Sequence, residues 1–232
     1  MARPPRIIIA GYPHHITQRG NNKQPTFKKA EDYRHYLAFW TYHSKKNRLS
    51  TLAFNLMPNH IHFITVPNHS TAVSNTLRVC QSQYSQHLNK KYGTCGHLWH
   101  SRFYSTALDE RHLYEAIRYV ENNPVEAQLV NHPEEWPWSS AAYHLEKGRS
   151  PVPLLPIEDF LEIADWRAYL NEKRNEEVIK TINQNSSKGK PSGGDMFEVE
   201  LEIITGITFP TRRRGRPYQI NSVSHHLSLN SD

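Results

Sequence analysis

Apolar residues over the first 145 positions recur with two periods, one typical of helices and one typical of strands. Tyr33, Leu37 and Trp40 belong to a helical series, and a second series of the same kind follows the next two strand-like runs. Shorter runs rich in β-branched and aromatic residues predict strands. The expected helices are 31–46, 73–88 and 109–122, and the expected strands are 6–9 with 15–19, 49–56, 61–66 and 102–108.

Four local signals refine these boundaries. Gly11 and Pro13 interrupt the first strand-like run, and Met57-Pro58-Asn59 separates two strands as the connection of an antiparallel hairpin. Asp109 is a suitable N-cap for the third helix. Pro124 is expected to end that helix near residue 122, because its ring disfavours helical geometry in the preceding residue.

The order of the elements is strand, helix, strand, strand, helix, strand, helix. This order predicts an α+β fold in which an antiparallel sheet of the split β-α-β kind has its helices packed on one face. The density of such signals falls after Trp136-Pro137-Trp138.

We therefore expect three parts: a main domain over 1–145, a connector over 146–195 and a C-terminal extension over 196–232. In the connector, 160–182 is expected to form a charged helix and 184–195, rich in Ser, Gly and Lys, a flexible linker. A short apolar patch at 197–204 precedes a run of arginines.

The net charge of +6 comes from 28 Lys and Arg against 22 Asp and Glu, and its distribution is uneven. Without Arg212, Arg213, Arg214 and Arg216 the chain holds 24 basic and 22 acidic residues. Arg-Gly-Arg-Pro at 214–217 resembles the core of an AT-hook, which fits the narrow minor groove of an A/T tract. The alternative is a basic tail that binds phosphates without sequence preference.

Other classes of protein are disfavoured by composition. No apolar run approaches the roughly 20 residues that span a bilayer, and 7–10 is too short for a signal-peptide core. Cys80 and Cys95 have no CxxC partner, which argues against a disulfide framework or a cysteine zinc site. These features predict a cytoplasmic protein without a membrane partner.

His60 and His62 are the first residues with candidate chemistry. Side chains two positions apart on a strand share one face, so both imidazoles can point to one metal while Ile61 packs in the core. Two histidines suit several divalent metals, with the other positions left to a third protein ligand, water or substrate. Taken alone, such a pair more often consists of two histidines in a hydrated hairpin than of metal ligands.

Tyr119 and Asn123 are the second candidates. Their spacing of four places them on one helix face, where an amide oxygen of Asn123 could complete a His-His-Asn metal site beside the Tyr119 phenol. A phenol needs an electrophile already polarised by a metal to act as a nucleophile. The alternative role for Tyr119 is amphipathic packing with a hydrated hydroxyl, and Tyr114 competes with it as the reactive tyrosine.

Five blocks, in this order, resemble the signatures of the REP-associated tyrosine transposases, a branch of the single-tyrosine HUH transposases of bacteria. The blocks are Gly11-Tyr12-Pro13-His14-His15-Ile16-Thr17-Gln18-Arg19-Gly20-Asn21-Asn22, Leu56-Met57-Pro58-Asn59-His60-Ile61-His62-Phe63, Gly96-His97-Leu98-Trp99 with Arg102-Phe103, Tyr119-Val120-Glu121-Asn122-Asn123-Pro124-Val125, and Trp136-Pro137-Trp138-Ser139-Ser140. The resemblance covers about residues 3–145, and His14-His15 stands where the family usually has Tyr-His.

The resemblance implies a ferredoxin-like catalytic domain, the HUH nuclease fold, with His60 and His62 as ligands of Mg²⁺ or Mn²⁺. It implies that Tyr119 is the nucleophile, that Asn123 helps to hold the metal and that Tyr114 is a packing residue. The implied substrate is single-stranded DNA beside REP hairpins, which Tyr119 would cleave through a 5′-phosphotyrosine link. The implied state is a monomer, with a dimer left open, acting at the nucleoid.

Residues expected to contact DNA are basic and lie in the signature blocks, at the N-terminus or in the arginine run. They are Arg3, Arg6, Arg19, Arg102, Arg212, Arg213, Arg214 and Arg216. The preferred function is a metal-dependent DNA endonuclease and strand transferase. The alternative is a domesticated DNA-binding or regulatory protein that recognises the hairpin without turnover.

Overall fold

A four-stranded antiparallel sheet, with strand order β2-β3-β1-β4, lies at the centre of the computed structural model, which describes residues 6–209. The connection of its strands is that of a ferredoxin-like fold, in which β1 and β3 are the central, antiparallel pair. The strands are β1 (His14–Arg19), β2 (Leu49–Met57), β3 (His60–Pro67) and β4 (Tyr104–Ala107).

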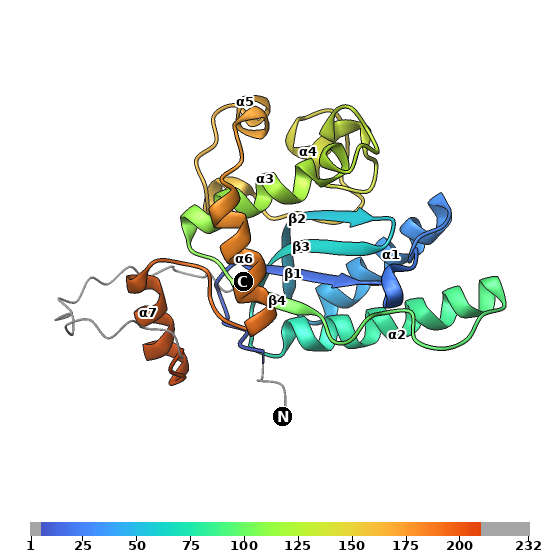
Figure 1. Cartoon of the computed structure of the whole chain (residues 1–232), viewed down its shortest axis with the longest axis horizontal. Helices are drawn as coiled ribbons and strands as arrows, with labels where there is room; N and C mark the ends of the chain where they lie inside the picture. Colours follow the sequence, from blue (N-terminus) through green and yellow to red (C-terminus); the bar gives the residue numbers. More distant parts are fainter. Residues whose placement is uncertain (1–5, 210–232) are drawn as a thin grey trace.

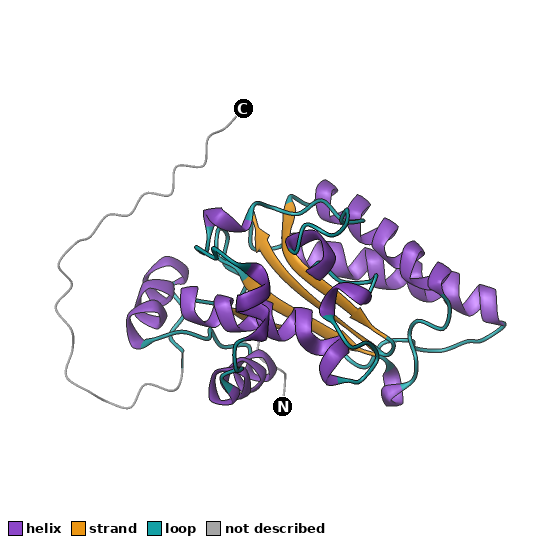
Figure 2. Ribbon diagram, turned by 90° about the horizontal axis from the view of Figure 1, so that it is seen from above, coloured by secondary structure: helices purple, strands orange, loops and turns teal. Residues whose placement is uncertain are grey.

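Helices cover both faces of this sheet (Figure 1 and Figure 2). One face carries α1 (Ala30–Lys46) and α2 (Ala72–Tyr92), as the split β-α-β pattern predicts. The opposite face carries α3 (Glu110–Glu126). The predicted α+β, ferredoxin-like fold is confirmed. The expectation that its helices pack on one face of the sheet was wrong, because α3 packs on the face opposite to α1 and α2.

The alternation of side chains along β3 separates two different environments. Ile61 and Phe63 point toward α1 and α2, where both are fully buried in an aromatic-rich core. That core includes a stacked pair, Trp40 and Phe63, with ring centroids 3.6 Å apart. Ile64 packs on the α3 side. His60 and His62 share that side with Ile64 because they lie four and two positions before it, respectively.

The first strand begins later than the sequence pattern predicts. Residues 6–13 have no strand structure, and the ladder with β3 starts at His14. Gly11 has a φ of +80°, a backbone conformation that favours glycine, and Pro13 has no amide hydrogen for a ladder. The expectation of a strand at 6–9 was therefore wrong.

The expected end of α3 at Pro124 was also wrong, because the helix continues to Glu126. Proline cannot donate the hydrogen bond that the carbonyl of Val120, four residues earlier, would otherwise accept. The side chain of Asn55 on β2 supplies the missing donor: its Nδ2 lies 2.8 Å from the Val120 carbonyl oxygen. Asn55 is completely buried. A contact with the sheet thus compensates for the proline.

The chain after α3 forms several short helices. The charged helix expected over 160–182 is interrupted at residues 172–175, where the Asn175 side chain accepts from the Val178 amide and begins a new helix. The further helices are α4 (Ala141–His144), α5 (Trp166–Asn171), α6 (Glu176–Lys188) and α7 (Asp195–Thr205), with 3₁₀ turns at Asn21–Lys23, Pro133–Glu135 and Ile157–Asp159.

The segment expected to be a flexible linker, 184–195, is attached to the sheet. Residues 184–188 belong to α6, and the Ser192 amide donates to the Ala107 carbonyl of β4 at 2.8 Å. Val178, Ile179 and Ile182 of α6 are buried in the same cluster as the apolar face of α3. The expectation of a flexible linker was wrong, whereas the division into 1–145, 146–195 and 196–232 stays a prediction.

Within residues 6–209, no helix combines the length and the apolar character needed to cross a membrane.

The contact between Asn55 and Val120 predicts a coupling between Asn55 and Pro124. Asn55→Ala should destabilise the protein by about 1–3 kcal/mol, since it leaves a buried carbonyl without a donor. In the Pro124→Ala background residue 124 regains an amide that can donate to Val120, so the same substitution should cost about 1 kcal/mol less. Urea unfolding of the four proteins measures this cycle, and strictly additive losses would contradict the explanation.

Candidate active site

His60 and His62 lie on the face of β3 that α3 covers, and the neighbouring strand β1 adds a third histidine. The ladder pairs Thr17 with His62 and His15 with Ile64, so His15 and His62 are diagonal neighbours on one face. His15 Nε2 lies 2.9 Å from His62 Nδ1, within hydrogen-bonding distance. The planes of the two rings are nearly parallel, with an interplanar angle of 5°.

The other ring nitrogen of His62 is a buried polar atom without a hydrogen bond. Within residues 6–209, His62 Nε2 has no hydrogen-bond partner. A histidine that ligates a metal usually donates its second ring N–H to a neighbouring acceptor, which fixes its tautomer. A proton on His62 Nδ1 that is donated to His15 Nε2 would leave the His62 Nε2 lone pair free. His60 is similar, since its Nδ1 lies 2.6 Å from the Asn59 side-chain oxygen.

Burial keeps these imidazoles neutral. It lowers the pKa of His15 to about 4, and together with the nearby Arg19 it lowers the pKa of His60 to about 4 as well. The pKa of His62 lies well below its ordinary value because His62 is buried and has His60 and His15 beside it. At neutral pH all three rings therefore carry a lone pair, which is the form that binds metal ions.

Tyr119 lies against this histidine cluster. Its ring centroid is 5.6 Å from that of His62 and 6.4 Å from that of His15, and it meets both rings nearly at right angles. Tyr114 lies elsewhere: its ring packs against Tyr169, with centroids 4.5 Å apart. Of the two competing tyrosines in α3, the structure thus brings Tyr119 to the histidines.

The hydroxyl of Tyr119 lies where α3 faces α6. Burial raises its pKa above the ordinary value, and the negative charge of Glu126 acts in the same direction. The neighbouring Asn123 and Asn183 side chains and the positive charge of Arg174 lower that pKa. The Arg174 guanidinium lies 5.6 Å from the centre of the Tyr119 ring. Asn123 and Tyr119 line the same hollow, as the helical spacing predicts, and Asn123 Nδ2 is buried without a hydrogen-bond partner among residues 6–209.

An open hollow of about 610 Å³ surrounds this end of Tyr119. Its walls come from α3, from α6 and from Arg174 in the segment before α6, and almost all of its lining side chains are polar. They are Tyr119, Asn123, Glu126, Arg174, Glu176, Ile179, Lys180, Asn183, Gln184 and Ser187. A substrate could therefore reach the Tyr119 hydroxyl between α3 and α6.

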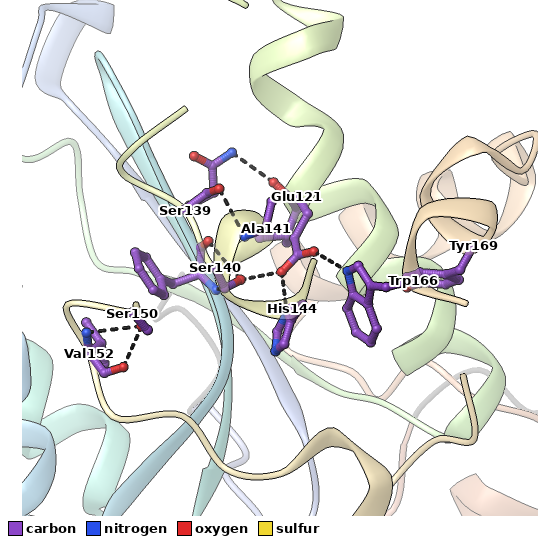
Figure 3. A network of polar contacts seen from close by, with 12 residues as sticks. Glu121, Ser139, Ser140, Ala141, His144, Ser150, Val152, Trp166 and Tyr169 are labelled. Atoms are coloured by element: carbon purple, nitrogen blue, oxygen red, sulfur yellow. Dashed lines mark hydrogen bonds and ion pairs between the residues drawn. The ribbon is translucent and has the colours of Figure 1, made fainter. Parts of the chain in front are cut away.

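The buried carboxylate of Glu121 fixes α3 two residues after Tyr119 (Figure 3). It accepts hydrogen bonds from Ser140 Oγ at 2.5 Å and Trp166 Nε1 at 2.9 Å, and lies 2.7 Å from His144 Nδ1. Three partners compensate for the burial of this acidic group. The network joins the segment after Trp138 to the helix that carries Tyr119.

The described part of the chain contains no group of three or more His, Cys, Asp or Glu side chains arranged to hold a metal ion. A metal would need ligands of other kinds, and the amide oxygen of Asn123 is the candidate that the sequence predicts. His15, although close, is already engaged with His62 through Nε2.

The arginines expected to contact DNA occupy different places. Arg19 is exposed and stands opposite His60 in the ladder, so it borders the histidine cluster. Arg102 is exposed just before β4, and Arg6 lies over the Phe103 ring with its Nε 2.6 Å from the Phe103 carbonyl oxygen. Arg3, Arg212, Arg213, Arg214 and Arg216 lie outside the described residues.

Four residues near the site were not predicted from the sequence. They are Asn55, Arg174, Asn183 and, in its role as a partner of His62, His15. A His-His pair at 14–15 was visible in the sequence, but nothing in it related His15 to a strand 47 residues later. The other three carry no local motif, because their contacts depend on how distant elements pack.

Comparison with known proteins agrees with this geometry. Residues 10–123 match the sequence model of the family described as "Transposase IS200 like". No protein of curated function matches the chain significantly.

Two solved structures resemble the chain. The structure of a REP-associated tyrosine transposase bound to a REP hairpin has 20% sequence identity and a TM-score of 0.55, over 71% of this chain and 96% of that chain. This similarity shows a shared fold. A protein described as a transposase from Deinococcus radiodurans R1 has 18% identity and a TM-score of 0.34, over 52% of this chain and 97% of that chain.

The family match includes β1, the β2–β3 hairpin with both histidines, and α3 as far as Asn123. The resemblance predicted from the signature blocks is confirmed by the family match and by the shared fold. Through residues 10–123, the chain belongs to the IS200-like transposase family.

Proposed function

We propose that this transposase is a metal-dependent single-stranded DNA endonuclease and strand transferase that acts through Tyr119. The observation that carries the proposal is the position of the Tyr119 ring, 5.6 Å from the ring of His62. His62 and His60 share a strand face, and burial keeps both neutral. A phenol next to unprotonated imidazoles suits a nucleophile that works beside a metal ion.

In the proposed reaction the Tyr119 oxygen attacks the scissile phosphorus. The phenol proton leaves to water, a P–Oη bond forms, and the bond from phosphorus to the 3′-oxygen breaks. The 3′-oxygen takes up a proton and leaves as a 3′-hydroxyl, while the 5′ side stays attached to Tyr119. Since the phosphodiester is preserved in this link, another 3′-hydroxyl can reverse the reaction and rejoin strands without ATP.

The side chains present fit a divalent ion such as Mn²⁺ or Mg²⁺. His62 Nε2 is buried without a partner among the described residues, and His60 and Asn123 would provide the other ligands. When bound, such an ion neutralises charge that develops on the phosphate oxygens. Asn123 lines the same hollow as Tyr119, so it would link the metal site to the nucleophile.

We propose single-stranded DNA beside REP-type hairpins as the substrate. The support is the shared fold with a transposase whose structure holds a REP hairpin, together with the signature blocks. Arg19 and Arg102, both exposed, are candidates for contacts with the DNA backbone. We expect a monomer to be sufficient, because Tyr119 meets His62 within one chain.

The central prediction concerns Tyr119 and its neighbour Tyr114. With a labelled REP hairpin and Mn²⁺, the protein should form a covalent adduct that survives denaturing electrophoresis. Tyr119→Phe should abolish the adduct, because the nucleophilic oxygen is removed. Tyr114→Phe, a matched control on the same helix, should keep it. Cleavage that survives in Tyr119→Phe would refute the assignment, and tight hairpin binding without any adduct would favour the regulatory alternative.

His15 should act through His62. His15→Ala removes the partner of His62 Nδ1 and should lower Mn²⁺ affinity and adduct formation by about 10- to 100-fold. His15→Gln offers an amide acceptor and should recover part of the loss. Calorimetric titration with Mn²⁺ measures the affinity directly, and unchanged affinity in His15→Ala would contradict this role.

Removal of residues 212–232 tests the arginine run. The truncated protein should bind the hairpin more weakly, with a shallower dependence on salt, because fewer counterions are released. Its adduct formation at saturating DNA should stay close to that of the full chain. An unchanged salt dependence would show that these arginines do not contact DNA.

A further inference from the structure

One side of α6 is a polar stripe that shares the hollow with Tyr119. The stripe consists of Lys180, Asn183, Gln184 and Ser187, whose spacing of three and four residues places them along one face of the helix. Lys180, Asn183, Gln184 and Ser187 are all exposed, and all line the hollow. The stripe lies beyond residue 123, where the match to the transposase family ends.

The remaining side of α6 holds the helix in place. Val178 and Ile182 are buried in the cluster that includes the apolar face of α3, and Ile179 is 4% exposed although it borders the hollow. The helix that carries the stripe is therefore held in place next to Tyr119 by its buried side. A surface of this kind needs little reordering when it binds a ligand.

Two cationic side chains, Arg174 and Lys180, line the hollow, and they differ in their ion pairs. Arg174 is shared between two carboxylates, forming ion pairs with Glu126 and with Glu176, the latter at 2.6 Å. Lys180 has no ion pair with any of residues 6–209. The charges of Arg174 and Lys180 balance those of the two glutamates, so Lys180 is the lining cation available to an incoming anion.

The chemistry of the stripe matches a nucleic-acid backbone. An ammonium, two amides and a hydroxyl supply hydrogen-bond donors, and none of the four side chains carries negative charge. Such side chains make most contacts to phosphate and sugar in protein–DNA complexes. A single strand could follow the stripe to Tyr119, which lines the same hollow as Asn183.

We propose that the polar stripe of α6 binds the sugar-phosphate backbone of the single strand next to the phosphate that Tyr119 attacks, with Lys180 as its phosphate contact. This inference rests on the proposed function and extends it to a segment that the sequence predicted to be a connector. The stripe recognises the strand without regard to its bases, since its partners are phosphate and sugar.

The test measures binding separately from cleavage, in the Tyr119→Phe protein, with a labelled oligothymidine strand across a range of salt concentrations. Lys180→Gln should weaken binding roughly fivefold and make the slope of log K against log salt shallower by about 0.7, the value for one phosphate contact on a single strand. Lys180→Arg should keep the original slope. Gln184→Ala should weaken binding without changing the slope, because it removes no charge.

Lys188→Gln is the matched control, with the same loss of charge on an exposed residue of α6 that does not line the hollow. It should leave the slope unchanged. Equal losses in Lys180→Gln and Lys188→Gln would attribute the effect to net charge and overturn the proposal. No measurable binding of oligothymidine by the Tyr119→Phe protein would overturn it as well.

Adduct formation on the REP hairpin, in the chain with Tyr119 intact, separates this inference from the proposed function. If adducts form but Lys180→Gln changes neither oligothymidine binding nor its salt slope, the proposed function is upheld and the role of the stripe is refuted. A lack of adducts, together with the predicted change in salt slope, would uphold the stripe as a DNA-binding surface and refute the catalytic function. Thermal unfolding of Lys180→Gln should match that of the unsubstituted protein, since Lys180 is exposed.

Discussion

The hydrogen bond from Asn55 to the Val120 carbonyl is the contact on which the geometry of the site depends most directly. Pro124 would end or kink an isolated helix, because it leaves the Val120 carbonyl without its usual donor. The buried side chain of Asn55 on β2 supplies that donor, with its Nδ2 2.8 Å from the Val120 carbonyl oxygen. The same bond holds the C-terminal half of α3 to the sheet, so Tyr119, one residue before Val120, lies over the histidines.

Packing of α3 on the sheet also sets the protonation state of the histidine cluster. His15 and His62 are buried beneath the helix, and burial disfavours the charged imidazolium. The cluster is therefore neutral at a pH where exposed histidines begin to titrate. Glu121 adds a second constraint on the helix, because its buried carboxylate is stable only with its donors in place. The packing of α3 on the sheet thus determines both where Tyr119 lies and the protonation state of the histidines beside it.

The part of the chain after the family match contributes to the site as well. α6 supplies the polar stripe, including Asn183, which lines the same hollow as Tyr119. Without its C-terminal arginines the chain is nearly neutral, and the hollow is balanced in charge as well, because two cationic and two anionic side chains line it. DNA binding at this site would therefore depend on individual donors more than on a broad positive field.

The sequence by itself determined the features that depend on local periodicity. Alternation along residues 60–66 places His60 and His62 on one strand face, helical spacing relates Tyr119 to Asn123, and Asp109 caps α3 as predicted. Tertiary structure alone decided which distant groups meet: His15 with His62, Asn55 with Val120, and α6 with Tyr119. Strand register and helix docking bring these partners together across long separations, and a local pattern contains no information about either. For the same reason the expectation that Pro124 ends α3 failed: the hydrogen bond from Asn55 on β2 lets the helix continue.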